Sequence, residues 1–350
     1  MATQDILITT YPGHKSKNVG DNLISASAIA LIRARKPSYQ PLVVFREHSL
    51  DAFKGQARTI LAPGFSVSNE TYPKLFRLYS NVNDLQAFFP VGCSFQHPMP
   101  GHASFDDYEF DDSTLRFLRY LTKISGPLPC RDMLIERLLR RNRIDAVYFG
   151  DLALFDDRYV RTSFKPPVEI RSVVFTIHHH HARFDQQGLK ILERIAARFP
   201  DQKKYIAFHS SPHALSKAFA ALAIEKGFES LDLSGDAANL DVYRDVDLHI
   251  GYRLHGHISF LRRRKPSILF VEDARSFGFA NSGKFSIGCF DAFDPDGQVA
   301  HRDLEARAFE FLEEQISSKF ESYSDVFRML DSLYMKEVNP YFDRFCSSLV

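Results

Sequence analysis

Both the fold class and the candidate site are decided by the stretch Gly251-Tyr252-Arg253-Leu254-His255-Gly256-His257. It follows the strand-like segment 246–250, in which Val246, Leu248 and Ile250 are apolar, and precedes residues with helical spacing. Open α/β sheets bind ligands at this place, where a strand ends and a helix begins, and the amide groups of the helix start favour an anion. Arg253 adds a planar cation for a carboxylate or phosphate, and His255 and His257 can exchange protons near neutral pH. The stretch predicts an anion-binding site with acid–base chemistry.

Apolar runs alternate with segments of helical spacing along the chain, which predicts parallel sheets joined by crossover helices. A proline-containing link at 164–167 divides this pattern, so we expect two Rossmann-like domains, residues 1–165 and 166–350, facing a cleft. Residues 303–334 also have helical spacing. Strands are expected near Ile6, Val43, Ile60, Phe88, Val147, Val173, Tyr205, Leu231, Leu248 and Ile268, and helices near Leu23, Leu115, Leu134, Leu189, Ala218 and Leu254.

Composition excludes several function classes. The chain has 350 residues, 45% of them hydrophobic, and a formal net charge of +1, so no overall field favours nucleic acid or an anionic membrane. No apolar run is long enough to span a bilayer, and residues 1–5 lack the pattern of a signal peptide, so we expect a cytoplasmic protein. The four cysteines are scattered, which argues against a zinc site or a disulfide framework.

Three further motifs precede the Arg253 stretch: Asn18-Val19-Gly20-Asp21-Asn22, Pro129-Cys130-Arg131-Asp132, and Gly150-Asp151-Leu152-Ala153. In this order the motifs resemble the polysaccharide pyruvyl transferase family, over roughly residues 5–290. The chain departs from the family where Leu152 replaces proline, where 91–94 is a thinned glycine-rich stretch, and where four histidines, 178–181, stand in place of an arginine. These departures bear on donor and acceptor specificity.

The resemblance implies a glycosyltransferase-B-like fold and transfer of a pyruvyl group from phosphoenolpyruvate. The acceptor would be a sugar hydroxyl pair on a saccharide or lipid-linked saccharide, giving a ketal on a surface or exopolysaccharide precursor. No cofactor is implied beyond the donor, and peripheral association with envelope-biosynthesis machinery is compatible with this role. By analogy with two-domain folds of this type, the terminal helices should cross back to the first domain. Two alternatives remain: a transferase of the same fold that uses a nucleotide sugar, and a non-catalytic glycan-binding relative.

Residue roles follow from the chemistry together with the resemblance. Arg253 and Arg131 would hold the carboxylate and phosphate. His255 would protonate the methylene carbon and Asp21 would act as the base, or these two roles would be exchanged. His257 would support this acid or bind phosphate. The remaining candidates for substrate binding are Asn18, Gly20, Leu254, Gly256, His178, Asp273 and Arg275.

Structural explanations compete with several of these roles. Arg253 could pair with Asp245 or Asp247, and Asp21 could simply cap a helix. A helix starting at Arg253 would place that residue and His257 on one face. Asp273 and Arg275 could form a local salt bridge or line the cleft, and the basic run 262–265 is typical of a solvated helix end.

The histidine run has two interpretations. In an extended segment His178 and His180 would share a face and could bind a metal. Adjacent histidines without a neighbouring carboxylate or cysteine ligand are more typical of a polar strand end, so no metal site is expected. A place for His178 in the lining of the donor pocket is favoured instead.

Overall fold

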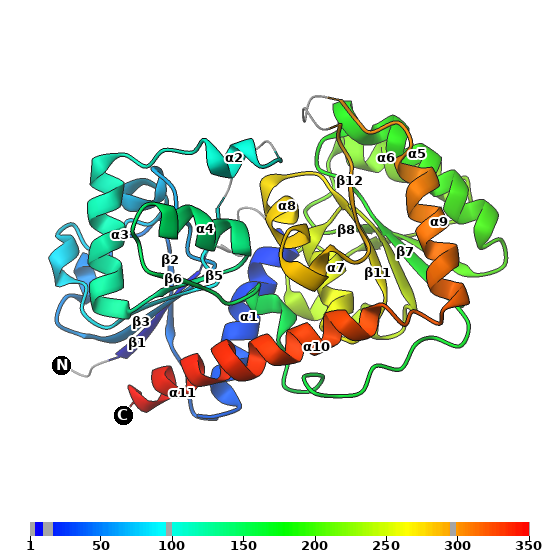
Figure 1. Cartoon of the computed structure of the whole chain (residues 1–350). Helices are drawn as coiled ribbons and strands as arrows, with labels where there is room; N and C mark the ends of the chain where they lie inside the picture. Colours follow the sequence, from blue (N-terminus) through cyan, green and yellow to red (C-terminus); the bar gives the residue numbers. More distant parts are fainter. Residues whose placement is uncertain (1–3, 10–16, 96–99, 295–298, 350) are drawn as a thin grey trace.

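A computed structural model describes residues 4–9, 17–95, 100–294 and 299–349. Two parallel sheets lie side by side in the molecule (Figure 1). The first sheet has the strand order β2-β1-β3-β4, and a bridge between Cys93 and Cys130 links it to the parallel pair β5-β6. Its strands are β1 (Gln4–Thr9), β2 (Leu42–Phe45), β3 (Ala57–Pro63), β4 (Phe88–Val91), β5 (Leu128–Cys130) and β6 (Ala146–Tyr148). Its helices are α1 (Val19–Arg33), α2 (Ala103–Asp106), α3 (Asp112–Ser125) and α4 (Met133–Arg141).

The second sheet has the order β12-β11-β10-β7-β8-β9. Every residue of β7 and β11 is buried, as expected for parallel strands that helices cover on both faces. Its strands are β7 (Ser172–Thr176), β8 (Lys203–Phe208), β9 (Glu229–Asp232), β10 (Leu248–Gly251), β11 (Ser267–Val271) and β12 (Cys289–Asp291). Its helices are α5 (His181–Arg198), α6 (Ala214–Ile224), α7 (Leu254–Leu261) and α8 (Ala274–Ala280), followed by α9 (Leu304–Ser317).

Two more helices, α10 (Tyr323–Leu333) and α11 (Asn339–Ser347), run from the second sheet back to the first (Figure 1). The Tyr341 hydroxyl donates to the Pro90 carbonyl at 2.9 Å, and Asp343 pairs with Arg35 at 2.8 Å. The prediction that the chain's end crosses back to the first domain is therefore confirmed. None of the helices in the described ranges combines the length and apolarity needed to cross a membrane.

The predicted strands and helices are all present, and the α/β prediction is confirmed. The strands β5 and β12 and the helices α2, α8 and α11 were not predicted. The link at 164–167 lies between β6 and β7.

The interpretation of the basic run 262–265 as a solvated face is wrong. Arg262, Arg263 and Arg264 are buried at the end of α7, beneath elements that supply acidic partners. Arg262 pairs with Asp156 at 2.7 Å, Arg263 with Asp241 at 3.1 Å, and Arg264 with Asp331. Buried cations need acidic partners. The end of α7 is therefore covered by the segments that carry these three aspartates, and it does not face solvent.

Candidate functional site

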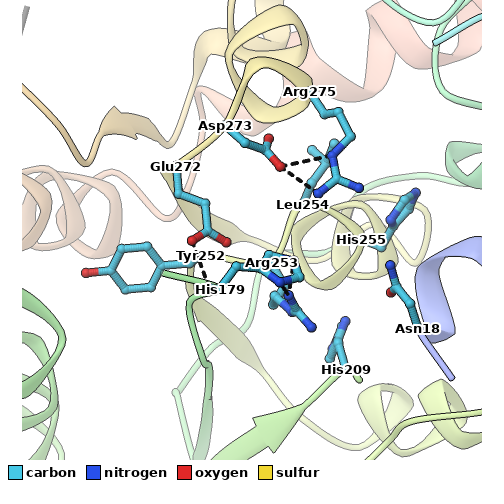
Figure 2. A pocket seen from close by; sticks show the side chains of 10 residues that line it. All are labelled: Asn18, His179, His209, Tyr252, Arg253, Leu254, His255, Glu272, Asp273 and Arg275. Carbon is cyan, nitrogen blue, oxygen red and sulfur yellow. Dashed lines mark hydrogen bonds and ion pairs between the residues drawn. The ribbon is translucent and has the colours of Figure 1, made fainter. Parts of the chain in front are cut away.

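A small pocket opens where the second sheet meets the start of α1 (Figure 2). The space between its lining residues, with the open mouth included, is about 330 Å³. The carboxyl ends of β7, β8, β10 and β11 supply most of its lining, as the rule for open α/β sheets predicts. The lining residues are Asn18, His179, His209, Tyr252, Arg253, Leu254, His255, Glu272, Asp273 and Arg275.

Helix α1 completes the pocket although it follows a strand of the first sheet. The Val19 amide donates to the His209 carbonyl at 2.9 Å, and Asn22 accepts from the Ala237 amide at 2.8 Å. Asn18 caps the helix by accepting from the Gly20 amide at 3.1 Å. The start of α1 is thus bonded to the second sheet, and Asn18 lies next to His255 (Figure 2).

Arg253 is held in place by its neighbours rather than by an acid. It precedes the first residue of α7 with extended dihedral angles, its amide donates to Thr176 Oγ1 at 3.2 Å, and its guanidinium donates to Ser210 Oγ at 2.7 Å. The guanidinium also contacts the His179 ring (Figure 2). No carboxylate of the described residues lies within ion-pair distance, and Asp247 instead accepts from the Arg171 amide at 2.9 Å. Arg253 is therefore available to an anionic ligand, although burial lowers its pKa to about 10.

Asp273 and Arg275 both form a local salt bridge and line the pocket. Asp273 caps α8, and its carboxylate accepts from Arg275 Nη2 at 2.6 Å and from Nε at 2.9 Å. The charge of Asp273, and more weakly that of Asp21, raises the pKa of Arg275. Glu272 accepts from the His179 amide at 2.9 Å, and burial, assisted by the charge of Asp273, raises the pKa of Glu272 to about 8. With Glu272 protonated near neutral pH, the two arginines leave the lining net positive.

His255 is seated between the two sheets. A Cβ added to Gly20 would lie 2.2 Å from His255 Nδ1, so glycine is needed for this close approach. On its other side, His255 Nε2 lies 3.7 Å from Asp151 Oδ2, which in turn is 3.7 Å from Arg131 Nη1. Burial would raise the pKa of Asp151, but His255 and Arg131 outweigh it and hold that pKa below its ordinary value.

Polar atoms in this junction lack partners. Arg131 Nε and Nη2, Asp151 Oδ2 and His255 Nε2 are buried without a hydrogen bond to any described residue. Buried polar groups are rarely left unpaired, so these atoms are expected to meet a ligand or ordered water. The structure therefore brings together three of the predicted candidates, Gly20, Arg131 and His255, with Asp151, but of these three only His255 lines the pocket.

His257 does not lie in the pocket, contrary to its predicted role. Its Nδ1 lies 2.7 Å from Ser267 Oγ, and its side chain is fully buried between α7 and β11. The helix begins at Leu254 rather than Arg253, so Arg253 and His257 do not share a helical face. Gly256 is likewise outside the lining: a Cβ there would lie 2.9 Å from His249 Nε2. Leu254 does line the pocket.

Two other predicted residues have different places. His178 is buried behind the pocket against Asp185, and its neighbour His179 lines the pocket instead, because the chain turns between β7 and α5. Asp21 follows in the first turn of α1 but is not part of the lining. Its carboxylate makes no hydrogen bond to any described residue, and its charge acts on Arg253 and Arg275.

Besides His179, sequence reasoning missed five residues of the site, one of which is Tyr252 in the Arg253 stretch itself. His209, Ser210 and Glu272 directly follow β8 and β11, so the strand-end rule that found Arg253 could have found them once the strands were placed. Asp151 was part of a quoted motif but had no assigned role.

No family model and no curated protein matches the chain. Solved structures share its fold at low identity. One is MnaA of S. aureus with UDP, at a TM-score of 0.53 and 9% identity over 92% of this chain and 93% of that one. Another is the UDP-GlcNAc 2-epimerase of Neisseria meningitidis bound to UDP-GlcNAc, at a TM-score of 0.51 and 8% identity over 96% and 100%.

A third similar structure is S. aureus TarM in complex with UDP, at a TM-score of 0.47 and 12% identity. That match covers 85% of this chain but only 57% of TarM, so this chain spans little more than half of that protein's length. The likenesses to MnaA and to the epimerase show that the chain has the two-domain, glycosyltransferase-B-like fold.

Proposed function

We propose that this chain is a transferase that moves a pyruvyl group from phosphoenolpyruvate to two hydroxyls of a saccharide, forming a ketal. The observation that carries the proposal is the small pocket in which the guanidinium groups of Arg253 and Arg275 lie beside His255 (Figure 2). Phosphoenolpyruvate is a small donor with two anionic groups, so it requires two fixed cations within a short distance. The order of the sequence motifs supports the same donor.

The pocket residues have distinct tasks in this reaction. Arg253, with no acidic partner, binds one anionic group of the donor through paired N–H groups, and Arg275 binds the second. His255 delivers a proton to the methylene carbon, and Asp151 stabilises its charged form. The neighbouring carbon then forms bonds to the two acceptor oxygens while its bond to the phosphate oxygen breaks. Of the two hydroxyl protons released, one replaces the proton delivered to carbon and the other leaves on phosphate.

Asp21 is the proposed base on the acceptor side. It lies on α1, one residue after the glycine that contacts His255, and its carboxylate is uncommitted among the described residues. Because Asp21 is outside the pocket lining, this role requires the acceptor to lie between α1 and Arg275. A saccharide between the two sheets would occupy that position.

A nucleotide-sugar transferase is the second candidate. Structures of the same fold hold UDP or UDP-GlcNAc, and a diphosphate could also bind Arg253. The pairing of Arg253 and Arg275 in one pocket favours a small donor that carries two anionic groups. A glycan-binding protein without turnover would bind the saccharide but release neither phosphate nor nucleotide.

Donor binding followed by phosphate release distinguishes these functions. Calorimetric titration of the full chain should show phosphoenolpyruvate binding that is weakened in Arg253→Lys and retained in Arg194→Lys, which alters an exposed arginine of α5. With saccharide acceptors in heavy water, phosphate should appear together with one solvent deuterium in the new methyl group. Binding of UDP-GlcNAc but not of phosphoenolpyruvate would reject pyruvyl transfer in favour of the second candidate.

A further inference from the structure

A second polar cluster lies behind the pocket, where β7 ends and α5 begins. His178 Nε2 lies 2.7 Å from Asp185 Oδ1, and His181 Nδ1 lies 2.8 Å from the same oxygen. One donor atom of each of the three residues lies within 4.8 Å of the others. The chain therefore directs two imidazoles and a carboxylate at one point, from residues that the proposed reaction does not use.

Packing alone does not explain the cluster. The side chains of His178 and His181 are 0% and 4% exposed, and both rings point at one oxygen of a carboxylate that remains 43% exposed. The remaining ring nitrogen of His178, Nδ1, is buried without a hydrogen-bond partner among the described residues. Buried imidazoles that serve only to pack have no need to converge on a single oxygen, whereas ligands of an ion must converge.

We propose that His178, His181 and Asp185 bind one divalent transition-metal ion, for which Zn²⁺ is the suitable probe. Two imidazoles and a carboxylate form a recurrent donor set for Zn²⁺, and such sites keep a further position for water. Small side-chain movements would bring the donor atoms to the required distances of about 2.0–2.2 Å from the ion. The sequence alone favoured no metal and considered His178 with His180; the turn into α5 instead brings His181 and Asp185 to His178.

The ion can enter from solvent and can gain a further ligand. A groove lined by His181, Asp185 and Lys190 opens beside the cluster. The ring of His213, at the start of α6, packs edge-on against His181 with 5.2 Å between the ring centres. His213 is thus placed to supply a fourth donor after a change of rotamer.

The ion would fix the segment that carries His179. This residue lies between the ligands in sequence, its ring contacts the Arg253 guanidinium, and its amide donates to Glu272 at 2.9 Å. Bound metal would hold this segment against α5 from behind the pocket. The role is structural, and it does not depend on which reaction the pocket performs.

Zinc titration of untagged, chelator-treated full chain tests the proposal. One Zn²⁺ per chain should bind. His181→Ala and Asp185→Asn should each weaken Zn²⁺ affinity at least about a hundredfold, which exceeds the loss that usually follows mutation of a residue that only hydrogen-bonds to a metal ligand. Asp185→Asn keeps the side-chain shape at a half-exposed position, so it should fold. His180→Ala is the matched control, because it removes an exposed histidine of the same run.

Two further readouts separate a built site from chance binding to a histidine run. Zn²⁺ should raise the melting temperature of the wild type and of His180→Ala but not of Asp185→Asn, since only a ligand of the native state stabilises it. Cobalt should replace zinc and give the visible spectrum of an ion with nitrogen and oxygen ligands. The proposal is overturned if no stoichiometric binding occurs, if His181→Ala and Asp185→Asn bind as tightly as the wild type, or if His180→Ala abolishes binding.

Discussion

The substitution Gly20→Ala tests whether His255 rests on the first turn of α1. The added Cβ would lie 2.2 Å from His255 Nδ1 and 2.7 Å from its Cγ, whereas ordinary contact begins at 3.4 Å. The imidazole or the helix must therefore move by more than an ångström. Gly20 is inside a helix, so alanine causes no backbone strain of its own.

The magnitude follows from two opposing effects. Overpacking of a filled site costs about 1–3 kcal/mol, while alanine in place of glycine in a helix contributes at most about 1 kcal/mol of stability, the value for a helix interior. In the wild-type background Gly20→Ala should be neutral to destabilising by about 2 kcal/mol. In a His255→Ala background the obstacle is gone, so the same substitution should stabilise by up to about 1 kcal/mol.

The assay is a double-mutant cycle on stability, measured by thermal and denaturant unfolding. Ala30→Gly, at an exposed position of the same helix, is the control for helix propensity and should have equal effects in both backgrounds. Because a displacement of about 1 Å can reduce a rate about a hundredfold, Gly20→Ala should also slow turnover. If Gly20→Ala has the same effect in both backgrounds within about 0.5 kcal/mol, His255 does not rest on Gly20 and the reasoning fails.

Other substitutions test the charges of the site and of the junction behind it. Arg253→Lys should lose hydrogen bonds of about 1.5–3 kcal/mol and weaken phosphoenolpyruvate binding about tenfold to a hundredfold; unchanged calorimetric affinity would remove Arg253 from the anion site. His255→Gln should bind the donor normally but turn over about a hundredfold to ten-thousandfold more slowly, and a wild-type rate with solvent deuterium incorporation would exclude it as the acid. The pKa of Glu272 is about 8 in the folded protein, compared with an ordinary value of about 4.5 in the unfolded chain. The free energy of unfolding of the wild type should therefore fall as the pH rises from about 4.5 to 8, and melting scans of Glu272→Gln should not show this fall. Burial would raise the pKa of Asp156, but Arg158 and Arg262 outweigh it and lower that pKa. Asp156→Asn should therefore reduce the free energy of unfolding by about 3–5 kcal/mol at pH 7, and the difference in this free energy between variant and wild type should become smaller below about pH 4. An equal loss of stability at both pH values would contradict the ion pair.

The sequence by itself determined the fold class, the position of most strands, and Arg253 as the central cation. These features depend on local patterns: apolar runs specify buried parallel strands, and a strand followed by a helix start specifies the edge where ligands bind. The same local reasoning placed Asp273 and Arg275 at that edge. It also made His257 and His178 candidates, since residue type alone cannot tell a buried histidine from one that lines a pocket.

Only the tertiary structure decided which of these side chains meet. Helix α7 begins at Leu254, one residue later than predicted, so Arg253 lies ahead of the helix. His257 lies on the helix and points into the core, in a different direction from Arg253. The docking of α1 on the second sheet brings Gly20 under His255, and β6 brings Asp151 to its other side. Such contacts join residues more than 100 positions apart, and their distances are set by how whole sheets and helices pack, which no local pattern records.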